Sequence, residues 1–231
     1  MKKVKLASLY SGGKDSNFSI FRAQRIGHEI SCLVTIHPKA DDSLFFHYPN
    51  SWVTRYLAEA MHKPYYECKV DSVSKDAEVE ALDNAISHVK SIYDIQGIVH
   101  GGITSRFQND LFQKICSKHK LAMIVPLWHI HSSIYMHELI DNKFQVKVVG
   151  VSALGLDRTL LGMSLDNDLL DKLEYLSKKY SFNLSFEGGE AETLVTDCPM
   201  FSKKLDIKSA NILWDGQRGI FEILEVALVP K

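Results

Sequence analysis

The feature that most constrains the fold is an alternation of short apolar runs with amphipathic segments along the first half of the chain. The apolar runs predict buried strands over residues 4–10, 29–36, 64–70, 97–100 and 121–128. The segments between them carry apolar residues at spacings of three and four, which predicts helices over residues 17–26, 51–61, 79–89 and 107–115. Strands that alternate with helices indicate a parallel sheet with helices on both faces, joined by right-handed crossovers.

The pattern changes after about residue 128. Helices are predicted over residues 133–142 and 168–180, and strands over residues 144–151, 204–214 and 219–229. Asp215-Gly216 joins the last two runs and is typical of an antiparallel hairpin. The sequence therefore predicts an α/β protein with a parallel-sheet domain, residues 1–128, and a smaller α/β domain, residues 129–231, that ends in antiparallel strands.

Composition excludes several classes of protein. The chain has 27 Lys and Arg residues and 28 Asp and Glu residues, which gives a net charge of -1. Proteins that coat nucleic acid carry a basic excess, so we expect no nucleic-acid partner. The four cysteines form no close pair, which argues against a disulfide framework or zinc knuckle and suits a reducing compartment. No apolar run approaches the ~20 residues that a spanning helix needs. We expect a soluble, cytoplasmic protein without a membrane partner.

The first strand runs into Ser11-Gly12-Gly13-Lys14-Asp15-Ser16, hereafter the glycine loop. Glycines let the backbone approach an anion closely, and N–H groups at a helix start point toward it. The two serines add hydroxyl donors, Lys14 adds a cation, and Asp15 could hold Mg²⁺. The loop is not a Walker A motif, which would place glycine at Ser8 and a hydroxyl residue at Asp15, and no GxGxxG fingerprint is present. It predicts a phosphate-binding loop.

A second segment, residues 187–201 and hereafter the EGGE segment, concentrates carboxylates. It contains Glu187, Glu190, Glu192 and Asp197. Carboxylates could hold a cation or act as general bases. A solvated acidic turn is the alternative, and the sequence does not identify which carboxylate would be the base.

With these two segments in view, the chain resembles a known family. The glycine loop is similar to the PP-loop of ATP pyrophosphatases, and the EGGE segment is similar to the EGGE-x-ET signature of diphthine–ammonia ligases, although Ala191 replaces the usual aromatic residue. Further matches are residues 46–50, 101–108 and 151–157. The resemblance covers about residues 4–205 and is to the short archaeal form, without the extra C-terminal domains of long eukaryotic members.

The resemblance implies an adenine nucleotide alpha hydrolase-like fold and an ATP-dependent ligase. Such an enzyme adenylates the diphthine carboxylate of elongation factor 2, releases pyrophosphate, and lets ammonia displace AMP to leave the amide of diphthamide. It implies ATP and Mg²⁺ as cofactors, elongation factor 2 and ammonium as partners, and leaves room for a homo-oligomer. Residues 1–128 would bind ATP, and residues 129–231 would bind substrate.

The implied site residues divide into four groups. The ATP-binding group is Ser11, Gly12, Gly13, Lys14, Asp15, Ser16, Thr35, Ile36, His37, Gly101 and Gly102. The substrate-binding group is Ser105, Glu187, Gly188, Gly189, Glu190, Thr193 and Asp197. The catalytic group is Lys14, Asp15, Glu187, Glu190 and Glu192, and Asp15 is also the metal ligand.

Other interpretations stay open. The chain could be a PP-loop enzyme acting on another carboxylate, carbonyl or RNA base, or a sensor that binds adenine nucleotide without catalysis. His129, His131 and His137 could ligate a metal, although surface histidines are the simpler interpretation. Cys198 could be a sulfur nucleophile, but a small buried side chain is the simpler role.

Overall fold

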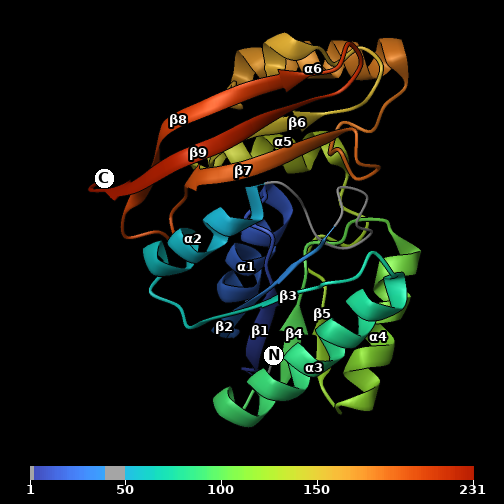
Figure 1. The fold of residues 1–231 in the computed structure, drawn as a ribbon, viewed down its shortest axis with the longest axis vertical. Coiled ribbons are helices and arrows are strands. Elements are labelled where there is room, and N and C mark those ends of the chain that lie inside the picture. Colours follow the sequence, from blue (N-terminus) through green and yellow to red (C-terminus); the bar gives the residue numbers. More distant parts are fainter. Residues whose placement is uncertain (1–2, 40–49) are drawn as a thin grey trace. The chain divides into compact units, whose positions relative to one another are not determined.

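The computed structural model describes residues 3–39 and 50–231, which divide into two compact units (Figure 1). The first unit comprises the chain up to Ser11 together with Asp15–Trp128. The second comprises Gly12–Lys14 together with His129–Lys231. The glycine loop is therefore divided, because its middle three residues pack with the C-terminal half of the chain.

The first unit is built on a five-stranded parallel sheet. Its strands are β1 (Lys5–Leu9), β2 (Glu29–His37), β3 (Tyr65–Lys69), β4 (Gly97–Val99) and β5 (Ala122–Ile124), in the order β3-β2-β1-β4-β5. All four neighbouring pairs are parallel, which confirms the predicted parallel sheet. The strand order reverses between β1 and β4, and ligands of open α/β sheets bind outside the carboxyl ends of strands at such a point.

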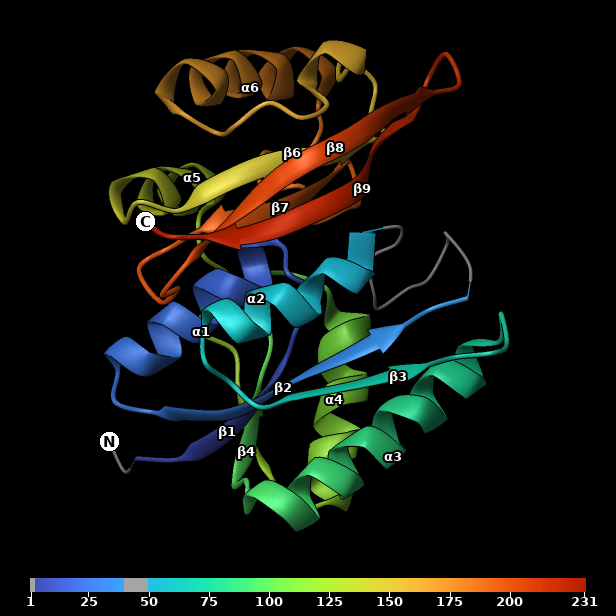
Figure 2. The same cartoon turned by 60° about the vertical axis from the view of Figure 1, so that its left-hand side comes forward.

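Helices cover both faces of this sheet, as predicted. They are α1 (Lys14–Arg25), the 3-10 turn η1 (Asn50–Val53) that leads into α2 (Thr54–Ala60), α3 (Lys75–Tyr93) and α4 (Arg106–Lys118). Figure 2 shows α1 and α2 on one side of the strands and α3 and α4 on the other. A buried cluster joins the sheet to α3 and α4; its members include Ala7, Val34, Ile36, Leu82, Ile86, Val89, Ile98, Phe112 and Ile115. Burial of this apolar surface is the main stabilising contribution to the first unit.

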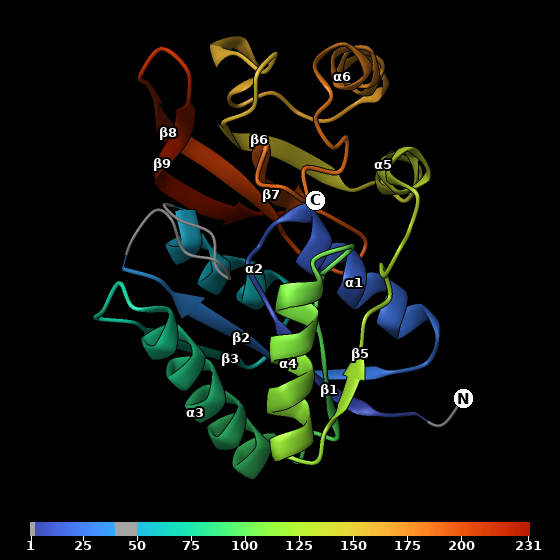
Figure 3. The same ribbon diagram turned by 90° about the vertical axis from the view of Figure 1, so that its right-hand side faces the viewer.

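The second unit contains a four-stranded antiparallel sheet. Its strands are β6 (Gln145–Val151), β7 (Ala191–Asp197), β8 (Lys204–Trp214) and β9 (Gly219–Val229), in the order β7-β6-β9-β8. The helices α5 (Ser132–Asp141) and α6 (Asn167–Tyr180) lie together on one face of the sheet, and the short turn η2 (Arg158–Leu160) follows β6 (Figure 3). The Asp215 carboxylate accepts the N–H groups of Gln217 and Arg218 at 2.8 and 2.7 Å, which closes the predicted β8–β9 hairpin.

Two elements differ from the sequence prediction. The strand β7 was not predicted, because its polar residues Glu192, Thr193 and Thr196 hide the alternation of apolar and polar residues. In the structure its register against β6 is irregular at two points. The strand predicted over residues 121–128 extends only over Ala122–Ile124, because proline at position 126 cannot donate to a ladder. Among the described residues, no helix is both long and apolar enough to cross a membrane.

Candidate functional site

The glycine loop follows β1 directly and leads into α1. Gly12 has a φ of +80°, a left-handed conformation that glycine adopts without steric cost. Within the first unit, the Ser11 hydroxyl lies 3.2 Å from the Ser16 hydroxyl, and the Ser11 N–H donates to the same Ser16 oxygen at 3.4 Å. The loop therefore folds back onto the first turn of α1, where the hydroxyls stand beside the N–H groups of the helix start.

Gly101 and Gly102 follow β4, the strand next to β1 at the reversal of the sheet order. A Cβ atom on Gly101 would lie 2.6 Å from the carbonyl carbon of Asp15 and 2.8 Å from the backbone nitrogen of Ser16. Only a residue without a side chain permits this approach of backbone to backbone. The two loops predicted to bind ATP are therefore in contact where the neighbouring strands β1 and β4 end.

The third predicted ATP-binding segment ends β2, next to β1. The Thr35 hydroxyl donates to the carbonyl oxygen of Tyr10 at 2.7 Å, and Ile36 is fully buried in the core. His37 closes the strand with its ring hydrogen-bonded on both nitrogens. The sequence match over residues 46–50 lies outside the described residues except for Asn50, which begins η1.

His100 lies under the Gly101-Gly102 turn and is buried. Its Nδ1 accepts the N–H of Gly102 at 3.1 Å, so the neutral ring carries its proton on Nε2. Burial lowers the pKa of His100 to about 4, and its ring packs edge-on against Phe112. His100 therefore shapes the glycine turn as a neutral group.

This burial predicts a loss of stability in acid. Below pH 6.5 His100 is protonated in the unfolded chain but stays neutral in the folded chain until the pH approaches 4. The free energy of unfolding therefore falls as the pH drops from about 6.5 toward 4. We expect the free energy of unfolding to fall by about 2 kcal/mol more between pH 7 and 5 in the natural chain than in His100→Gln. Urea unfolding at both pH values measures this difference. An unchanged pH dependence in His100→Gln would contradict the assignment.

In the second unit, residues 12–14 lie along β7, the edge strand of the antiparallel sheet. The Val195 N–H donates to the carbonyl oxygen of Gly12 at 3.0 Å, and the Lys14 N–H donates to the Thr193 hydroxyl at 3.2 Å. The first of these bonds satisfies an N–H group on the free edge of β7. Both bonds also join the glycine loop directly to the EGGE segment, the two motifs that the sequence singled out.

The Lys14 side chain is almost fully buried, with 2% of its surface exposed. Its ammonium nitrogen lies 5.8 Å from the ring centroid of Tyr135 and 5.4 Å from that of Phe186. Both distances fall within the range of cation–π attraction. Phe186 is the residue immediately before the EGGE segment. Its φ is +60°, a left-handed conformation that is strained for a bulky residue.

Glu190 organises the turn of the EGGE segment. One carboxylate oxygen accepts the N–H of Asn183 at 2.9 Å, and the other accepts the N–H of Gly188 at 2.8 Å. The Ser152 hydroxyl donates to the Gly189 carbonyl oxygen at 2.5 Å, which attaches the turn to the end of β6. A carboxylate that already accepts two backbone N–H groups is better suited to shaping the turn than to taking a proton from substrate.

Three further predicted residues make contacts within their own units. Asp197 pairs with Lys231 at 2.7 Å, and the Ser105 hydroxyl caps α4 by accepting the Gln108 N–H at 3.5 Å. Glu192 lies in β7 opposite Gly150, where a Cβ atom would meet the Glu192 side chain at 3.0 Å. In the part of the chain that the structure describes, no three His, Cys, Asp or Glu side chains are grouped to hold a metal. A magnesium ion here would need oxygen atoms from substrate in addition to Asp15, which is the usual mode for this ion.

Cys198 is buried, and burial raises the pKa of its thiol to about 12. The thiolate is the nucleophilic form, so Cys198 is unsuited to sulfur transfer in the folded protein. We expect Cys198 to resist alkylation by iodoacetamide at neutral pH and to react fully in denaturant. Peptide mapping by mass spectrometry measures both, and rapid alkylation of Cys198 in the folded chain would contradict its assignment as a structural residue.

Sequence reasoning missed the residues that complete the surroundings of Lys14. Tyr135 comes from α5 and Phe186 from the loop before β7, and neither belongs to a recognisable motif. Asn183 contributes only its backbone to Glu190, so its side-chain type gave no signal. These contacts follow from the packing of distant segments.

Comparison with known families gives two matches that together span most of the chain. The model described as the diphthamide synthase N-terminal domain matches residues 4–123, and the model described as the diphthamide synthase C-terminal domain matches residues 131–229.

Individual relatives agree with these matches. The chain is 31% identical to the diphthine–ammonia ligase of Homo sapiens, over 91% of this chain and 85% of that protein. It is 32% identical to the Bos taurus ligase, also over 91% and 85%. It is 30% identical to the Schizosaccharomyces pombe ligase, over 91% of this chain but 37% of that longer protein.

Proposed function

The chain belongs to the diphthamide synthase family, and from this premise we propose that it is an ATP-dependent amide ligase. In the proposed reaction the carboxylate of diphthine in elongation factor 2 attacks the α-phosphate of ATP and pyrophosphate leaves. Ammonia then attacks the acyl-adenylate, AMP leaves, and the amide of diphthamide remains. The resemblance of both sequence motifs to this family supports the proposal.

We assign residues 1–128 to ATP binding and residues 129–231 to the substrate. Three features support the ATP site: the glycine loop after β1, the close approach of Gly101 to Asp15, and the β2 end at Thr35–His37. All three lie at the carboxyl ends of adjacent parallel strands, which is where such sheets bind nucleotides. The Ser11 and Ser16 hydroxyls would donate hydrogen bonds to phosphate oxygens.

Lys14 supplies positive charge where negative charge grows as pyrophosphate leaves. A buried ammonium among aromatic rings is only weakly screened by water, so it stabilises that charge more strongly than an exposed lysine would. Asp15 would hold Mg²⁺ together with phosphate oxygens, and the ion would neutralise charge on the transferred group.

The carboxylates of the EGGE segment have different roles in the step in which ammonia attacks the acyl-adenylate. Glu190 shapes the turn through its two backbone hydrogen bonds. Glu187 and Glu192 are then the candidates for binding ammonium and for taking up its proton. Thr193 attaches this segment to the backbone of Lys14.

One observation carries the proposal furthest, namely the pair of hydrogen bonds that join Gly12 and Lys14 to Val195 and Thr193. Activation and amidation act on the same carboxyl carbon, so the phosphate loop and the carboxylates that handle ammonia must adjoin. An arrangement in which the two motifs share a strand edge meets this requirement.

The products of ATP test the proposal. The chain is incubated with ATP, Mg²⁺ and ammonium, with and without elongation factor 2 that carries diphthine. We expect AMP and pyrophosphate in amounts that depend on the factor. ADP as the product would contradict the reaction class, and AMP formed with a small carboxylate but not with the factor would contradict the substrate.

A further inference from the structure

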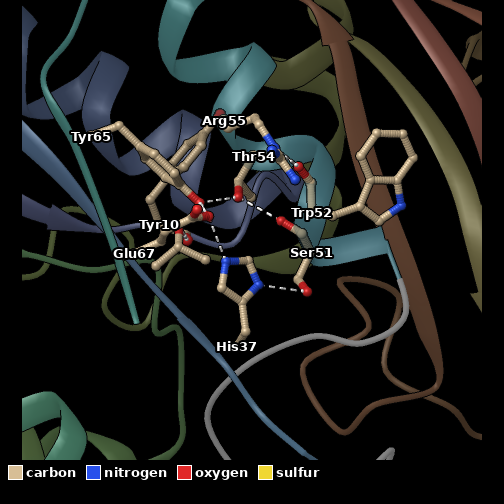
Figure 4. Close-up of polar contacts among 9 residues, drawn as sticks. Tyr10, His37, Ser51, Trp52, Thr54, Arg55, Tyr65 and Glu67 are labelled. Carbon is tan, nitrogen blue, oxygen red and sulfur yellow. Dashed lines mark hydrogen bonds and ion pairs between the residues drawn. The ribbon is translucent and has the colours of Figure 1, made fainter. Parts of the chain in front are cut away.

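A second group of reactive side chains lies in the first unit at the ends of β2 and β3. Figure 4 shows His37 between Ser51, from η1, and Glu67, from β3. The Ser51 hydroxyl lies 2.9 Å from His37 Nδ1, and His37 Nε2 lies 2.9 Å from a carboxylate oxygen of Glu67. A hydroxyl, an imidazole and a carboxylate in this order form the arrangement that activates a serine nucleophile.

The protons in this group can be assigned from its contacts. The Tyr65 hydroxyl also donates to Glu67, at 3.1 Å. Burial acts to raise the pKa of Glu67, but hydrogen bonds from His37 and Tyr65 outweigh it, so the pKa of this carboxyl lies below its ordinary value. An ionised carboxylate only accepts hydrogen bonds, so the hydrogen of the neutral ring is on His37 Nε2. His37 Nδ1 is then the acceptor for the Ser51 proton.

The surrounding residues hold both ends of the group in place. The Thr54 hydroxyl lies 2.6 Å from the carbonyl oxygen of Ser51 and 2.6 Å from the Tyr65 hydroxyl. Burial raises the pKa of Tyr65 to about 12, so it remains a neutral donor at physiological pH. Since Tyr65 donates its proton to Glu67, the single Thr54 proton goes either to Tyr65 or to the Ser51 carbonyl oxygen. Thr54 lies between the two and keeps the turn that carries the serine beside the residue that orients the carboxylate.

We propose that Ser51, His37 and Glu67 form a second reactive centre, a serine nucleophile for acyl transfer from carboxylic esters. His37 Nδ1 takes the proton as Ser51 Oγ attacks the ester carbonyl carbon. The carbon–alkoxy bond breaks, the alkoxide leaves as an alcohol with that proton, and an acyl-serine remains. Water then attacks the acyl-serine, its proton passes through His37 to Ser51 Oγ, and a carboxylic acid leaves.

The contact of a serine hydroxyl with an imidazole nitrogen distinguishes this centre from an ordinary polar contact. The ring nitrogens are exchanged relative to the common Ser–His–Asp arrangement, but the chemistry requires only that one nitrogen accepts from serine and the other donates to a carboxylate. Ser91 provides a contrast in the same unit, because its hydroxyl donates to the carbonyl oxygen of His88 and contacts no base. The chemistry requires neither ATP nor the EGGE segment, but His37 also belongs to the β2 end that is assigned to the ATP site, so the labelling is measured without ATP.

A fluorophosphonate probe tests the proposal, because an activated serine displaces fluoride from phosphorus. The full chain is treated with the probe, and peptide mass spectrometry locates the adduct. We expect one equivalent on Ser51, and none in Ser51→Ala. We expect His37→Gln to slow labelling by at least about 100-fold, the lower range for loss of a general base.

The choice of variants keeps the result interpretable. Glutamine at position 37 can still accept from Ser51 and donate to Glu67, so a thermal melt should show that the fold persists while the base is lost. Two matched controls, Ser91→Ala and His88→Gln, should be labelled at Ser51 at the natural rate. Absence of an adduct on Ser51 in the natural chain, or equal labelling rates in the natural chain and His37→Gln, would overturn the proposal and leave the group as a structural hydrogen-bond network.

Discussion

Replacing Lys14 with methionine should lower the rate of factor-dependent AMP formation by about 100-fold or more, the usual loss when a preorganised charge is removed from a reacting centre. Methionine keeps the apolar length of the side chain between Tyr135 and Phe186. Urea unfolding of the variant measures any change in stability separately, so the loss of turnover can be assigned to the missing charge in protein that is shown to be folded.

The chain offers a matched control for this prediction. Lys179 also lies over aromatic rings, 5.9 Å from the centroid of Tyr175 and 5.1 Å from that of Tyr180, but it is exposed on α6. Lys179→Met should keep the natural rate. Steady-state kinetics and urea unfolding of both variants measure the two effects, and full turnover in Lys14→Met would remove Lys14 from the catalytic group.

Replacing Glu190 with alanine should destabilise the chain by about 3 kcal/mol, because two hydrogen bonds to a charged acceptor are lost at about 1.5 kcal/mol each. The N–H groups of Asn183 and Gly188 would lose their acceptor, and the EGGE turn would lose its shape. Glu190→Gln offers only one acceptor oxygen to the two donors, so its loss of stability should be about half as large.

These variants separate a structural from a catalytic role for Glu190. If it shapes the turn, turnover should decline in parallel with stability, and Glu190→Gln should keep part of the activity. Urea unfolding together with AMP formation gives both quantities. Natural stability in Glu190→Ala with turnover abolished would instead give Glu190 a catalytic role, which the family resemblance implied for it.

The parallel sheet could be predicted because each of its elements has a local signal. β1 and β2 are apolar runs ended by turn residues, and α3 carries Leu82, Ile86 and Val89 on one face. The glycine loop was recognisable because close approach to an anion demands glycine, and the structure adds a second demand of this kind at Gly101.

The contacts that complete the site have no local signal. Lys14 meets Tyr135 and Phe186 only because α5 and the loop before β7 come together around residues 12–14 in the second unit. β7 was missed because an edge strand whose backbone bonds to a loop can carry polar residues that disguise its period. The Glu190 carboxylate looked catalytic in the sequence, whereas the structure shows it bound to two backbone N–H groups.

Transfer of nitrogen from ammonium to the factor tests the central claim most directly. Elongation factor 2 that carries diphthine is incubated with the chain, ATP, Mg²⁺ and ¹⁵N-labelled ammonium, and the modified peptide is analysed by mass spectrometry. We expect one labelled nitrogen in the side-chain amide, dependent on ATP and lost in Lys14→Met. ATP cleavage to AMP without labelled nitrogen in the factor would contradict the assignment of this chain as a diphthine amide ligase.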